Sequence, residues 1–329
     1  MTILITGVAG FIGAHVARAL LARGEEVIGF DNLNEYYPAT LKRHRLETLC
    51  NSSGFSFHRV DVALPEALER TLAGQRPVKI LHLAAQAGVR YSLENPAAYT
   101  EANLEGHFEM LELARKLEVE NMVYASSSSV YGGNTKIPFS ESDQTDDPVS
   151  FYGATKKSNE LMSQSYARLY GLSLTGLRFF TVYGPWGRPD MAYWIFAEKI
   201  MRGEPIRVFN HGKMSRDFTY VDDIVKGTIA ALDRPASTLD LPVPHRIYNL
   251  GNDRPEPLMD MIRLTEQGIG IAAEKQYEPM QKGDLEKTWA DIGRAREELD
   301  YAPSVGLHDG LTRFTHWFKD YWTTYSQEQ

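Results

Sequence analysis

The sequence predicts an α/β fold, a doubly wound parallel sheet with helices on both faces and a smaller C-terminal lobe. In the first half of the chain, short β-branched apolar segments alternate with longer amphipathic segments. That alternation is typical of parallel strands joined by helical crossovers. A glycine-rich segment, Gly7 to Gly13, also directly follows the first apolar segment, as in sheets that bind dinucleotides.

The elements follow in chain order from this alternation. The apolar segments predict strands at Thr2–Thr6, Glu26–Phe30, Phe55–Val60, Lys79–Leu83, Met122–Ser126 and Ser173–Leu177. The amphipathic segments predict helices at Phe11–Arg23, Thr40–Leu49, Pro65–Leu72, Pro96–Leu117 and Ser150–Tyr170. Strands and helices in this order indicate a sheet of the Rossmann type.

The alternation ends after Phe179. The cluster of Gly, Pro, Trp and Arg in Gly184–Pro189 is typical of a functional loop rather than a regular element. Val221–Leu232 predicts another helix, and Arg246–Leu250 predicts a strand that returns to the sheet.

A domain division follows from these segments. Residues 1–178 are expected to form a dinucleotide-binding domain, to which residues 219–250 return. Residues 179–329 are expected to form mainly a substrate-binding lobe. Open α/β sheets bind ligands at the carboxyl ends of their strands, so this lobe should cover that edge.

The composition excludes several classes of protein. The net charge of −8 argues against a nucleic-acid or anionic-membrane surface. No apolar stretch approaches the roughly 20 residues that span a bilayer. The chain enters Ile3-Leu4-Ile5 at once, which leaves no room for a signal peptide. The lone cysteine, Cys50, excludes an intramolecular disulfide and fits a reducing compartment. We therefore expect a cytoplasmic protein, and no residue pattern indicates a metal.

The glycine-rich segment predicts a dinucleotide site. Gly7, Gly10 and Gly13 permit a tight turn and a close approach of phosphate to the backbone, and Phe11 and Ile12 begin the following helix. The alternative is a structural turn without a ligand.

An acid at the end of the second predicted strand extends this site. Asp31, followed by Asn32, is placed to accept hydrogen bonds from the adenosine ribose. Its charge would repel a 2′-phosphate, so NAD is favoured over NADP. An unrelated acid at a strand end is the alternative.

Later strand ends supply further candidates for the cofactor. Asp61-Val62 could bound the adenine, although Asp61 is almost equally expected to be a helix cap. The small residues in Leu83-Ala84-Ala85 would let a dinucleotide lie across the sheet. Asn103, on the next predicted helix, could contact the cofactor or be a solvated polar position.

Tyr152 and Lys156 predict the chemistry. They lie at i and i+4 and therefore share one helical face. A phenol titrates near about 10, too high for an effective base at neutral pH. A lysine ammonium and a cationic nicotinamide nearby would both lower that pKa. Beside a dinucleotide site, the pair predicts oxidation of a substrate alcohol.

Four serines, Ser126 to Ser129, follow the fifth predicted strand. Their hydroxyls should lie at the carboxyl edge of the sheet, where one could hydrogen-bond the reacting alcohol and relay its proton to Tyr152. An ordinary polar strand end is the alternative.

Taken together, these residues resemble the extended short-chain dehydrogenase/reductase family of nucleotide-sugar epimerases and dehydratases. The motifs are the three glycines, Tyr152 with Lys156, Ser127–Gly132 and Arg216–Asp223. The resemblance implies NAD that stays bound through the catalytic cycle and a catalytic triad of Ser127, Tyr152 and Lys156.

Two further segments resemble the UDP-glucuronate 4-epimerase branch of that family. They are Asp31–Tyr37, with Leu41-Lys42 after it, and Gly187–Ala192. Relatives that eliminate water carry an Asp-Glu pair where this chain has Ser128-Ser129, and relatives that decarboxylate carry a glutamate at the position of Ser129. Neither acid is present.

The branch implies roles in binding a UDP-sugar. Thr181 should make a polar contact to the sugar nucleotide, Arg216 should meet the diphosphate, and Asp284 should accept from the uridine ribose. Lys282 stands where the branch would have proline.

Other positions are candidates for the sugar end of the substrate. Arg90 and Arg188 are expected there, although either could be a surface arginine. Ser128 and Ser129 are candidate hydrogen-bond donors to the sugar carboxylate.

The expected reaction is C4 epimerisation of UDP-glucuronate to UDP-galacturonate through a 4-keto intermediate. The alternatives are a UDP-glucuronate decarboxylase that forms UDP-xylose, a UDP-glucose 4-epimerase and a non-enzymatic NAD-sensing regulator. By resemblance, helices Pro96–Leu117 and Ser150–Tyr170 should pair in a homodimer, although their apolar residues could be core alone.

Overall fold

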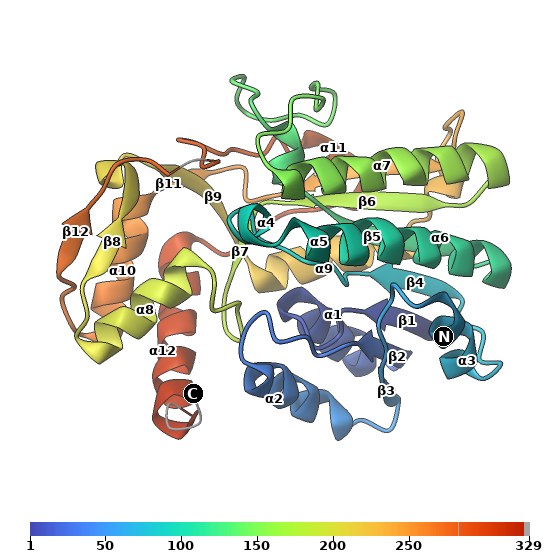
Figure 1. The fold of residues 1–329 in the computed structure, drawn as a ribbon, viewed down its shortest axis with the longest axis horizontal. Coiled ribbons are helices and arrows are strands. Elements are labelled where there is room, and N and C mark those ends of the chain that lie inside the picture. Colours follow the sequence, from blue (N-terminus) through green and yellow to red (C-terminus); the bar gives the residue numbers. More distant parts are fainter. Residues whose placement is uncertain (282, 326–329) are drawn as a thin grey trace.

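The computed structural model describes residues 1–281 and 283–325 and confirms the predicted fold class. A parallel sheet in the order β10-β6-β5-β4-β1-β2-β3 forms the centre of the molecule (Figure 1). Its strands are β1 (Thr2–Thr6), β2 (Glu26–Asp31), β3 (Phe55–Arg59), β4 (Lys79–His82), β5 (Asn121–Ser127), β6 (Leu174–Phe179) and β10 (His245–Leu250).

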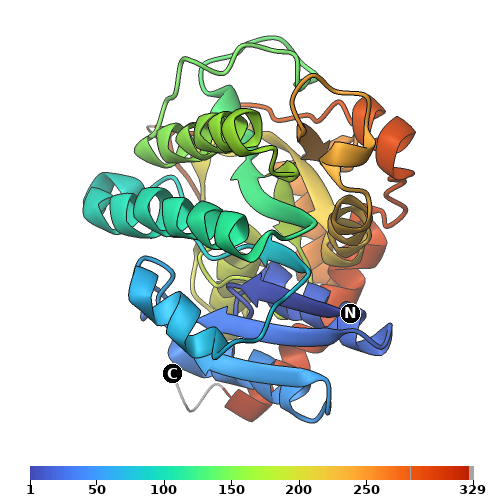
Figure 2. The ribbon, with the colours of Figure 1, turned by 90° about the vertical axis from the view of Figure 1, so that its right-hand side faces the viewer.

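Helices cover both faces of this sheet (Figure 2). In β1, Ile3 and Ile5 pack in one core and Leu4 in another, as expected when successive side chains of a strand alternate between faces. The first core includes side chains of α1 (Phe11–Ala22), α2 (Ala39–Cys50) and α9 (Val221–Asp233). The second includes side chains of α3 (Pro65–Leu72), α6 (Gly106–Leu117) and α7 (Phe151–Tyr170).

The long helix predicted over Pro96–Leu117 is interrupted. It consists of α5 (Pro96–Tyr99), a π-helical segment over Thr100–Glu105 and then α6, and the short helix α4 (Tyr91–Glu94) precedes it. The π segment contains the buried Asn103, whose side chain bonds to neighbouring segments. Such segments occur frequently at functional sites. By contrast, α7 matches its prediction, because Ser150 caps its first turn by accepting a hydrogen bond from Gly153 N at 3.0 Å.

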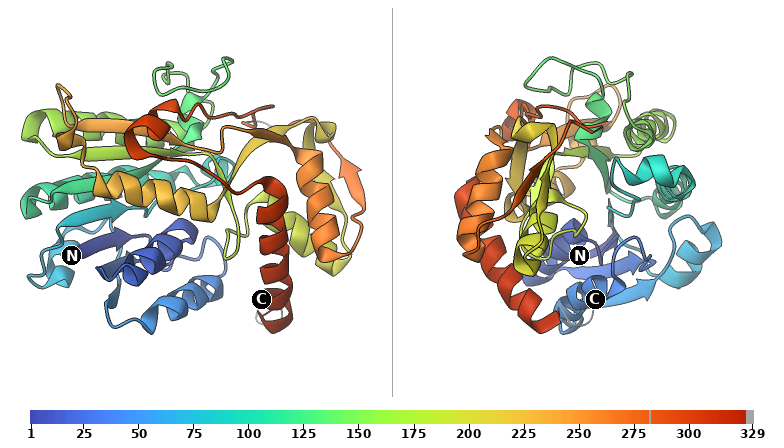
Figure 3. Two further views of the ribbon diagram at one scale, coloured as in Figure 1. Left: turned by 180° about the vertical axis from the view of Figure 1, so that it is seen from behind. Right: turned by 60° about the vertical axis from the view of Figure 1, so that its left-hand side comes forward.

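The rest of the chain forms a smaller lobe beside the carboxyl ends of the strands (Figure 3). One small sheet joins β7 (Thr181–Tyr183), β9 (Ser215–Tyr220) and β11 (Pro255–Pro257), and another pairs β8 (Ile206–Val208) with β12 (Lys275–Tyr277). The helices of this lobe are α8 (Ala192–Arg202), α10 (Leu258–Ile269) and α12 (Leu307–Tyr325), whereas α11 (Gly293–Leu299) packs against β10 and α9 beside the main sheet. Short 3₁₀ segments occur at Ser128–Tyr131, Phe209–Gly212 and Ala236–Thr238.

The two lobes share one hydrophobic core, which runs from β1 and α1 to α8 and α12. The predicted strand Arg246–Leu250 is found as β10, parallel to β6 at the edge of the main sheet. The division into two domains remains a prediction. No helix in the described part of the chain is long and apolar enough to cross a membrane.

Candidate active site

The predicted site residues converge on the carboxyl edge of the main sheet. Because β1, β2, β4 and β5 are parallel, their carboxyl ends lie on one edge. The segment Gly7–Gly13, here called the dinucleotide turn, follows β1. Asp31 ends β2, and Ser127 ends β5. The segment Gly184–Asp190, here called the sugar loop, follows β7 in the smaller lobe.

The dinucleotide turn has the backbone that a phosphate-binding turn requires. Gly7 has a φ of +70°, and a Cβ there would lie 2.7 Å from the backbone nitrogen of Ala84. A Cβ on Gly13 would clash with the carbonyl oxygen of Gly7. Helix α1 starts at Phe11 after Gly10, and within the described residues no side chain caps it. The first N–H groups of α1, including that of Ile12, therefore remain available to an anion.

Asp31 is buried beside this turn. One carboxylate oxygen accepts from Ala9 N at 3.1 Å and the other from Leu33 N at 2.8 Å. Burial raises the pKa of Asp31, while these two bonds and the cations of Lys42 and Arg45 oppose that rise. Each oxygen keeps a further lone pair, so the carboxylate can still accept from a ribose hydroxyl.

A cavity of about 350 Å³ lies next to the end of β2, where Asn32 follows Asp31. Its lining includes Asn32, Asp61, Gln86 and Glu101. Asn32 donates to Asp61 at 2.9 Å. The helix-cap alternative for Asp61 is wrong, because the N-cap residue of α3 is Leu64.

The remaining cofactor candidates pack around this edge. The buried Val62 lies against Gly106 of α6, and Leu83-Ala84-Ala85 follows β4 and borders the dinucleotide turn at Ala84. A bound dinucleotide fits this arrangement, which combines the glycine turn, the uncapped start of α1, the buried Asp31 and the neighbouring cavity. No cluster of metal-ligating side chains occurs among the described residues.

Asn103 is not the solvated residue that one interpretation expected. It is 1% exposed. Its side chain accepts from Gln86 N at 2.8 Å and donates to Gln86 O and to Thr155 Oγ1, both at 3.0 Å. Asn103 thus ties the segment after β4 to α7, the helix that carries Tyr152. A direct contact with the cofactor remains a prediction.

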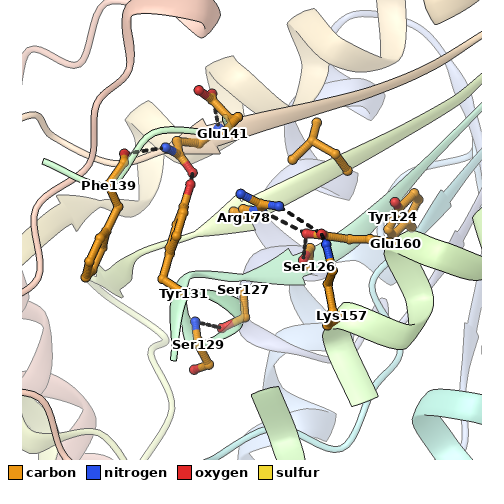
Figure 4. Close-up of polar contacts among 12 residues, drawn as sticks. Tyr124, Ser126, Ser127, Ser129, Tyr131, Phe139, Glu141, Lys157, Glu160 and Arg178 are labelled. Carbon is orange, nitrogen blue, oxygen red and sulfur yellow. Dashed lines mark hydrogen bonds and ion pairs between the residues drawn. The ribbon is translucent and has the colours of Figure 1, made fainter. Parts of the chain in front are cut away.

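The structure brings the three predicted catalytic residues together. Tyr152 and Lys156 lie on the first turns of α7, and the Ser127 hydroxyl at the end of β5 lies close enough to Tyr152 to lower the pKa of its phenol. Ser127 Oγ also accepts from Ser129 N at 3.1 Å (Figure 4). Ser128 and Ser129 begin a 3₁₀ segment and are partly exposed.

The electrostatics of Tyr152 differ from the sequence-based prediction. Burial raises its pKa, the hydroxyl of Ser127 and the charge of Arg188 lower it, and Asp190 raises it. Lys156 is buried, which lowers its pKa to about 7, and its ammonium donates to the Ala125 carbonyl at 2.9 Å. The net effect of the protein's own groups is therefore a raised pKa of Tyr152, and a lowering by Lys156 and by a bound nicotinamide remains a prediction.

A buried ion pair beneath the predicted catalytic residues was not expected from the sequence. Glu160 of α7 and Arg178 of β6 are each 4% exposed and form two hydrogen bonds, at 2.8 and 2.9 Å (Figure 4). Ser126 donates to Glu160 at 2.7 Å, and the guanidinium lies over the ring of Tyr131. One of the four serines is therefore structural, whereas its neighbour Ser127 meets Tyr152. A charged residue in the apolar segment of β6 was the available signal.

Arg188 occupies the sugar loop in a two-pronged pair with Asp190. Its Nε donates to one carboxylate oxygen at 3.0 Å and its Nη2 to the other. Tyr36 donates to the same carboxylate at 3.1 Å. Burial alone would raise the pKa of Asp190, but Arg188 and Tyr36 hold it below its usual value. Both members of the pair keep about a quarter of their side-chain surface exposed. The role of Arg188 towards a substrate carboxylate remains a prediction.

A second group of charged residues joins the segment before α4 to the smaller lobe. Arg90 pairs with Asp284 at 3.2 Å and lies over the ring of Phe209, 5.1 Å from its centre. Arg207 lies at the same distance from that ring. Arg90 was predicted for the sugar end, but its contacts place it with Asp284, predicted for the uridine. Phe209 is an additional candidate that the sequence did not indicate.

Arg216 and Thr181 belong to neighbouring strands of one small sheet. Arg216 donates to the carbonyl oxygens of Ser215 at 3.0 Å and Glu286 at 3.1 Å. Burial lowers its pKa, while Asp284 opposes that effect. Thr181 begins β7 and is partly exposed. Lys282, the departure from the expected proline, lies outside the described residues.

Comparison with known proteins gives consistent matches. Residues 3–251 match the model of the NAD dependent epimerase/dehydratase family. UDP-glucuronate 4-epimerase 4 of Arabidopsis thaliana is 46% identical over 98% of this chain and 76% of the relative. A probable UDP-glucuronate 4-epimerase of Rhizobium meliloti is 45% identical over 97% of each chain.

A solved structure matches as well. The UDP-glucuronic acid 4-epimerase of Bacillus cereus, crystallised with UDP-glucuronic acid and NAD, superposes with a TM-score of 0.90. It is 35% identical, and the match covers 97% of this chain and 99% of the other. With its dinucleotide turn, its buried Asp31 and its assembled Ser127, Tyr152 and Lys156, the chain belongs to the NAD dependent epimerase/dehydratase family.

Proposed function

We propose that this protein epimerises UDP-glucuronate at C4 to UDP-galacturonate, with NAD as its cofactor, through a 4-keto intermediate. The assembly of Ser127, Tyr152 and Lys156 at the sheet edge beside the dinucleotide turn carries the proposal. Relatives named as UDP-glucuronate 4-epimerases support it over nearly the whole chain, and the matching structure supports the same substrate and cofactor.

The protein's own residues supply the acid–base chemistry. Tyr152, aided by Ser127, takes the proton from the sugar O4 and returns it after the 4-keto sugar has rotated to present its other face to the cofactor. NAD, when bound on the dinucleotide turn and Asp31, supplies the two-electron acceptor and donor that the change at C4 requires. Lys156, held by Ala125, places a cationic group on the same helical face as Tyr152 and favours the phenolate when protonated.

The substrate's carboxylate creates a second task for the site. The intermediate is a β-keto acid, which loses CO₂ when the bond from C5 to the carboxylate aligns with the carbonyl π system. Ser128, Ser129 and Arg188 are the proposed donors that hold the carboxylate out of alignment, because hydrogen bonds to a charged group are the stronger kind. By the resemblance, Ser128 and Ser129 occupy the positions at which the dehydrating and decarboxylating relatives carry acidic residues.

Product analysis tests the proposal directly. Purified protein is incubated with UDP-glucuronate, and the stereochemistry of the product and the release of CO₂ are measured together. UDP-galacturonate without CO₂ is the expected result. UDP-xylose with stoichiometric CO₂ would instead make the protein a decarboxylase. Turnover of UDP-glucose alone would make it an epimerase of the neutral sugar, and the absence of any turnover would favour the regulatory reading.

We further propose that the protein is a homodimer. Helices α6 and α7 lie side by side on one face (Figure 2). Their outer surfaces expose apolar side chains: Phe108 is 42% exposed, Leu161 60% and Leu169 68%. A second copy would cover these residues in a four-helix interface. Sedimentation equilibrium tests this: a dimer that Leu161→Glu converts to a monomer is expected, and a wild-type monomer would contradict it.

A further inference from the structure

The two sequence segments that carry the branch resemblance meet in the structure. Asp31–Tyr37 with the start of α2 and Gly187–Ala192 mark the branch resemblance, and they are far apart in the chain. Tyr36 of the first segment donates to Asp190 of the second at 3.1 Å. Arg45, one turn after Lys42 on α2, also reaches the second segment. The two segments thus form one junction between the cofactor side and the substrate side of the site.

Arg45 is the centre of this junction. Its side chain is 1% exposed. Its Nη1 donates to the carbonyl oxygen of Ala9 at 3.0 Å and to the hydroxyl of Tyr37 at 2.8 Å. Its Nε donates to Trp186 O at 2.9 Å and its Nη2 to Gly187 O at 2.6 Å. One guanidinium therefore holds the dinucleotide turn and the sugar loop at the same time.

The hydrogen bonds from Arg45 stabilise a strained backbone in the sugar loop. Trp186 has a φ of +59°, in the left-handed region that residues with a Cβ rarely adopt. A Cβ on Gly187 would clash with the Tyr193 hydroxyl. Arg45 holds the carbonyls of both residues, immediately before Arg188. The direction of Arg188 consequently depends on where Arg45 fixes the loop.

On the cofactor side, Arg45 contacts a residue of the dinucleotide turn that also binds Asp31. Ala9 gives its carbonyl oxygen to Arg45 and its N–H to Asp31, at 3.1 Å. A shift of the sugar loop would therefore act on the turn that receives the dinucleotide, and on the acid predicted to hold its ribose. Lysine could not replace Arg45, because its single ammonium lacks the planar fork of donors that reaches several acceptors in fixed directions.

We propose that Arg45 is a positioning residue that couples the dinucleotide turn to the sugar loop, so that binding of the sugar end of the substrate tightens the hold on NAD. Tyr36, through Asp190, is the second tie of the same junction. This inference rests on the proposed function, because it takes the sugar carboxylate as the group that engages Arg188. By linkage, cofactor and substrate must then strengthen each other's binding by the same factor.

The rate of NAD release from the holoenzyme tests the coupling without measuring turnover. Retained NAD is quantified after rapid desalting, with saturating UDP-glucuronate or saturating UDP present. UDP reaches the nucleotide end but has no group for Arg188. In the wild type, UDP-glucuronate should slow NAD release by roughly fivefold or more relative to UDP, the low end of ordinary coupling.

Two variants and one control decide the outcome. Arg45→Lys and Tyr36→Phe should bring the ratio of the two release rates close to one. Arg43→Lys changes an exposed arginine of the same helix and should keep the wild-type ratio. An Arg45 that merely stabilises the fold would speed release equally with both ligands and leave the ratio unchanged, which would overturn the inference. If Arg45→Lys does not fold, an unchanged ratio in Tyr36→Phe overturns it.

Failure of the proposed function gives a different result. A chain that acts on another sugar nucleotide would yield no UDP-galacturonate from UDP-glucuronate in the product assay. A wild type that forms UDP-galacturonate but releases NAD equally with both ligands contradicts only the coupling. The two assays therefore separate the inference from the function on which it rests.

Discussion

Replacing Glu160 with Gln removes the negative member of the buried ion pair behind the proposed catalytic residues. Glu160 and Arg178 are each 4% exposed, and two hydrogen bonds join them. Glutamine keeps the size of the side chain and one oxygen acceptor. It removes the charge, however, and places an amide N–H₂ group where a second acceptor faced Arg178. The guanidinium then stays buried without its counter-charge.

The expected cost follows from this burial. Removing one partner of a buried ion pair costs about 3–5 kcal/mol, because the remaining charge is left uncompensated. The oxygen that glutamine retains can still accept from Arg178 or Ser126, which places the expected loss near the lower end, about 3 kcal/mol. A loss of this size should be accompanied by lower turnover, since Ser126 adjoins Ser127 and Glu160 lies one turn after Lys156.

Urea unfolding of wild type and variant measures this loss. Lys157→Gln is the matched control, because Lys157 meets the same carboxylate at 3.5 Å from a side chain that is 27% exposed. Screened pairs of this kind contribute roughly 0–1 kcal/mol. A double variant, Glu160→Met with Arg178→Met, should recover much of the loss, since an apolar pair of similar volume needs no counter-charge. Equal losses for Glu160→Gln and the Lys157 control would refute the reasoning.

The pH dependence of this effect has a defined sign. Burial alone would raise the pKa of Glu160, but Arg178 and Ser126 hold it below its ordinary value. A carboxyl group with a lowered folded-state pKa stabilises the fold fully above its unfolded pKa of about 4.3. That stabilisation is lost as the pH falls through the lower folded value. The difference between wild type and Glu160→Gln should therefore be full at pH 7 and shrink in acid below about pH 4.

Four further predictions concern the site itself. Tyr152→Phe should lower turnover by at least ~10²-fold with unchanged melting temperature, and near-normal turnover would exclude Tyr152 as the base. Asp31→Ala should weaken NAD binding and favour NADP, because the buried Lys42 would lose the nearby carboxylate and could then attract the 2′-phosphate. An unchanged ratio of NAD affinity to NADP affinity in the variant would contradict this. Arg188→Ala should reduce binding of UDP-glucuronate far more than binding of UDP and release some CO₂, whereas equal losses for both ligands would exclude the carboxylate role. Because Arg188 lowers and Asp190 raises the pKa of Tyr152, Arg188→Ala should move the acidic limb of the turnover profile to higher pH and Asp190→Asn to lower pH; shifts in the same direction would contradict the assignment.

The first half of the fold was predictable because its segments carry complete local signals. Strand Thr2–Thr6 and helix Pro65–Leu72 have the predicted bounds, and most other ends differ by one or two residues. Fully buried parallel strands read as continuous apolar segments, and crossover helices are amphipathic. The exception is Pro96–Leu117, where Asn103 sits in a π segment. Its bonds to Gln86 and Thr155 are tertiary, so no local pattern marks the break.

The second half was less predictable because its strands are short and their partners are distant. Strands β7, β8, β11 and β12 have three residues each, too few for an alternating pattern to appear. Strand β8 pairs with β12, some 70 residues later in the chain. Helices α10 and α12 are amphipathic, and closer attention to helical periodicity could have found them.

The site residues also divide into those that the sequence could predict and those that it could not. Gly7, Asp31, Tyr152 and Lys156 were predictable because each lies at a fixed place relative to a strand or helix. Asp190 could not be assigned a partner, because its contact with Tyr36 is set by the packing of one lobe on the other. A sequence shows that an arginine and an aspartate are present but not which charge neutralises which.

The contrast between paired arginines and Arg216 indicates where a chain with net charge −8 can attract an anionic ligand. Arg188 is paired with Asp190 and Arg90 with Asp284. These carboxylates fix the orientation of the two arginine side chains but also neutralise part of the charge that would attract an anion. Arg216 differs, because its hydrogen bonds within the described residues go to two carbonyl oxygens and burial lowers its pKa. A partly buried cation without a bonded carboxylate is unfavourable in the free protein. A diphosphate would supply the missing charge, so the strongest attraction should fall on the nucleotide. Arg188, which is paired with Asp190, should therefore contribute more to the orientation of the sugar than to the affinity for the ligand.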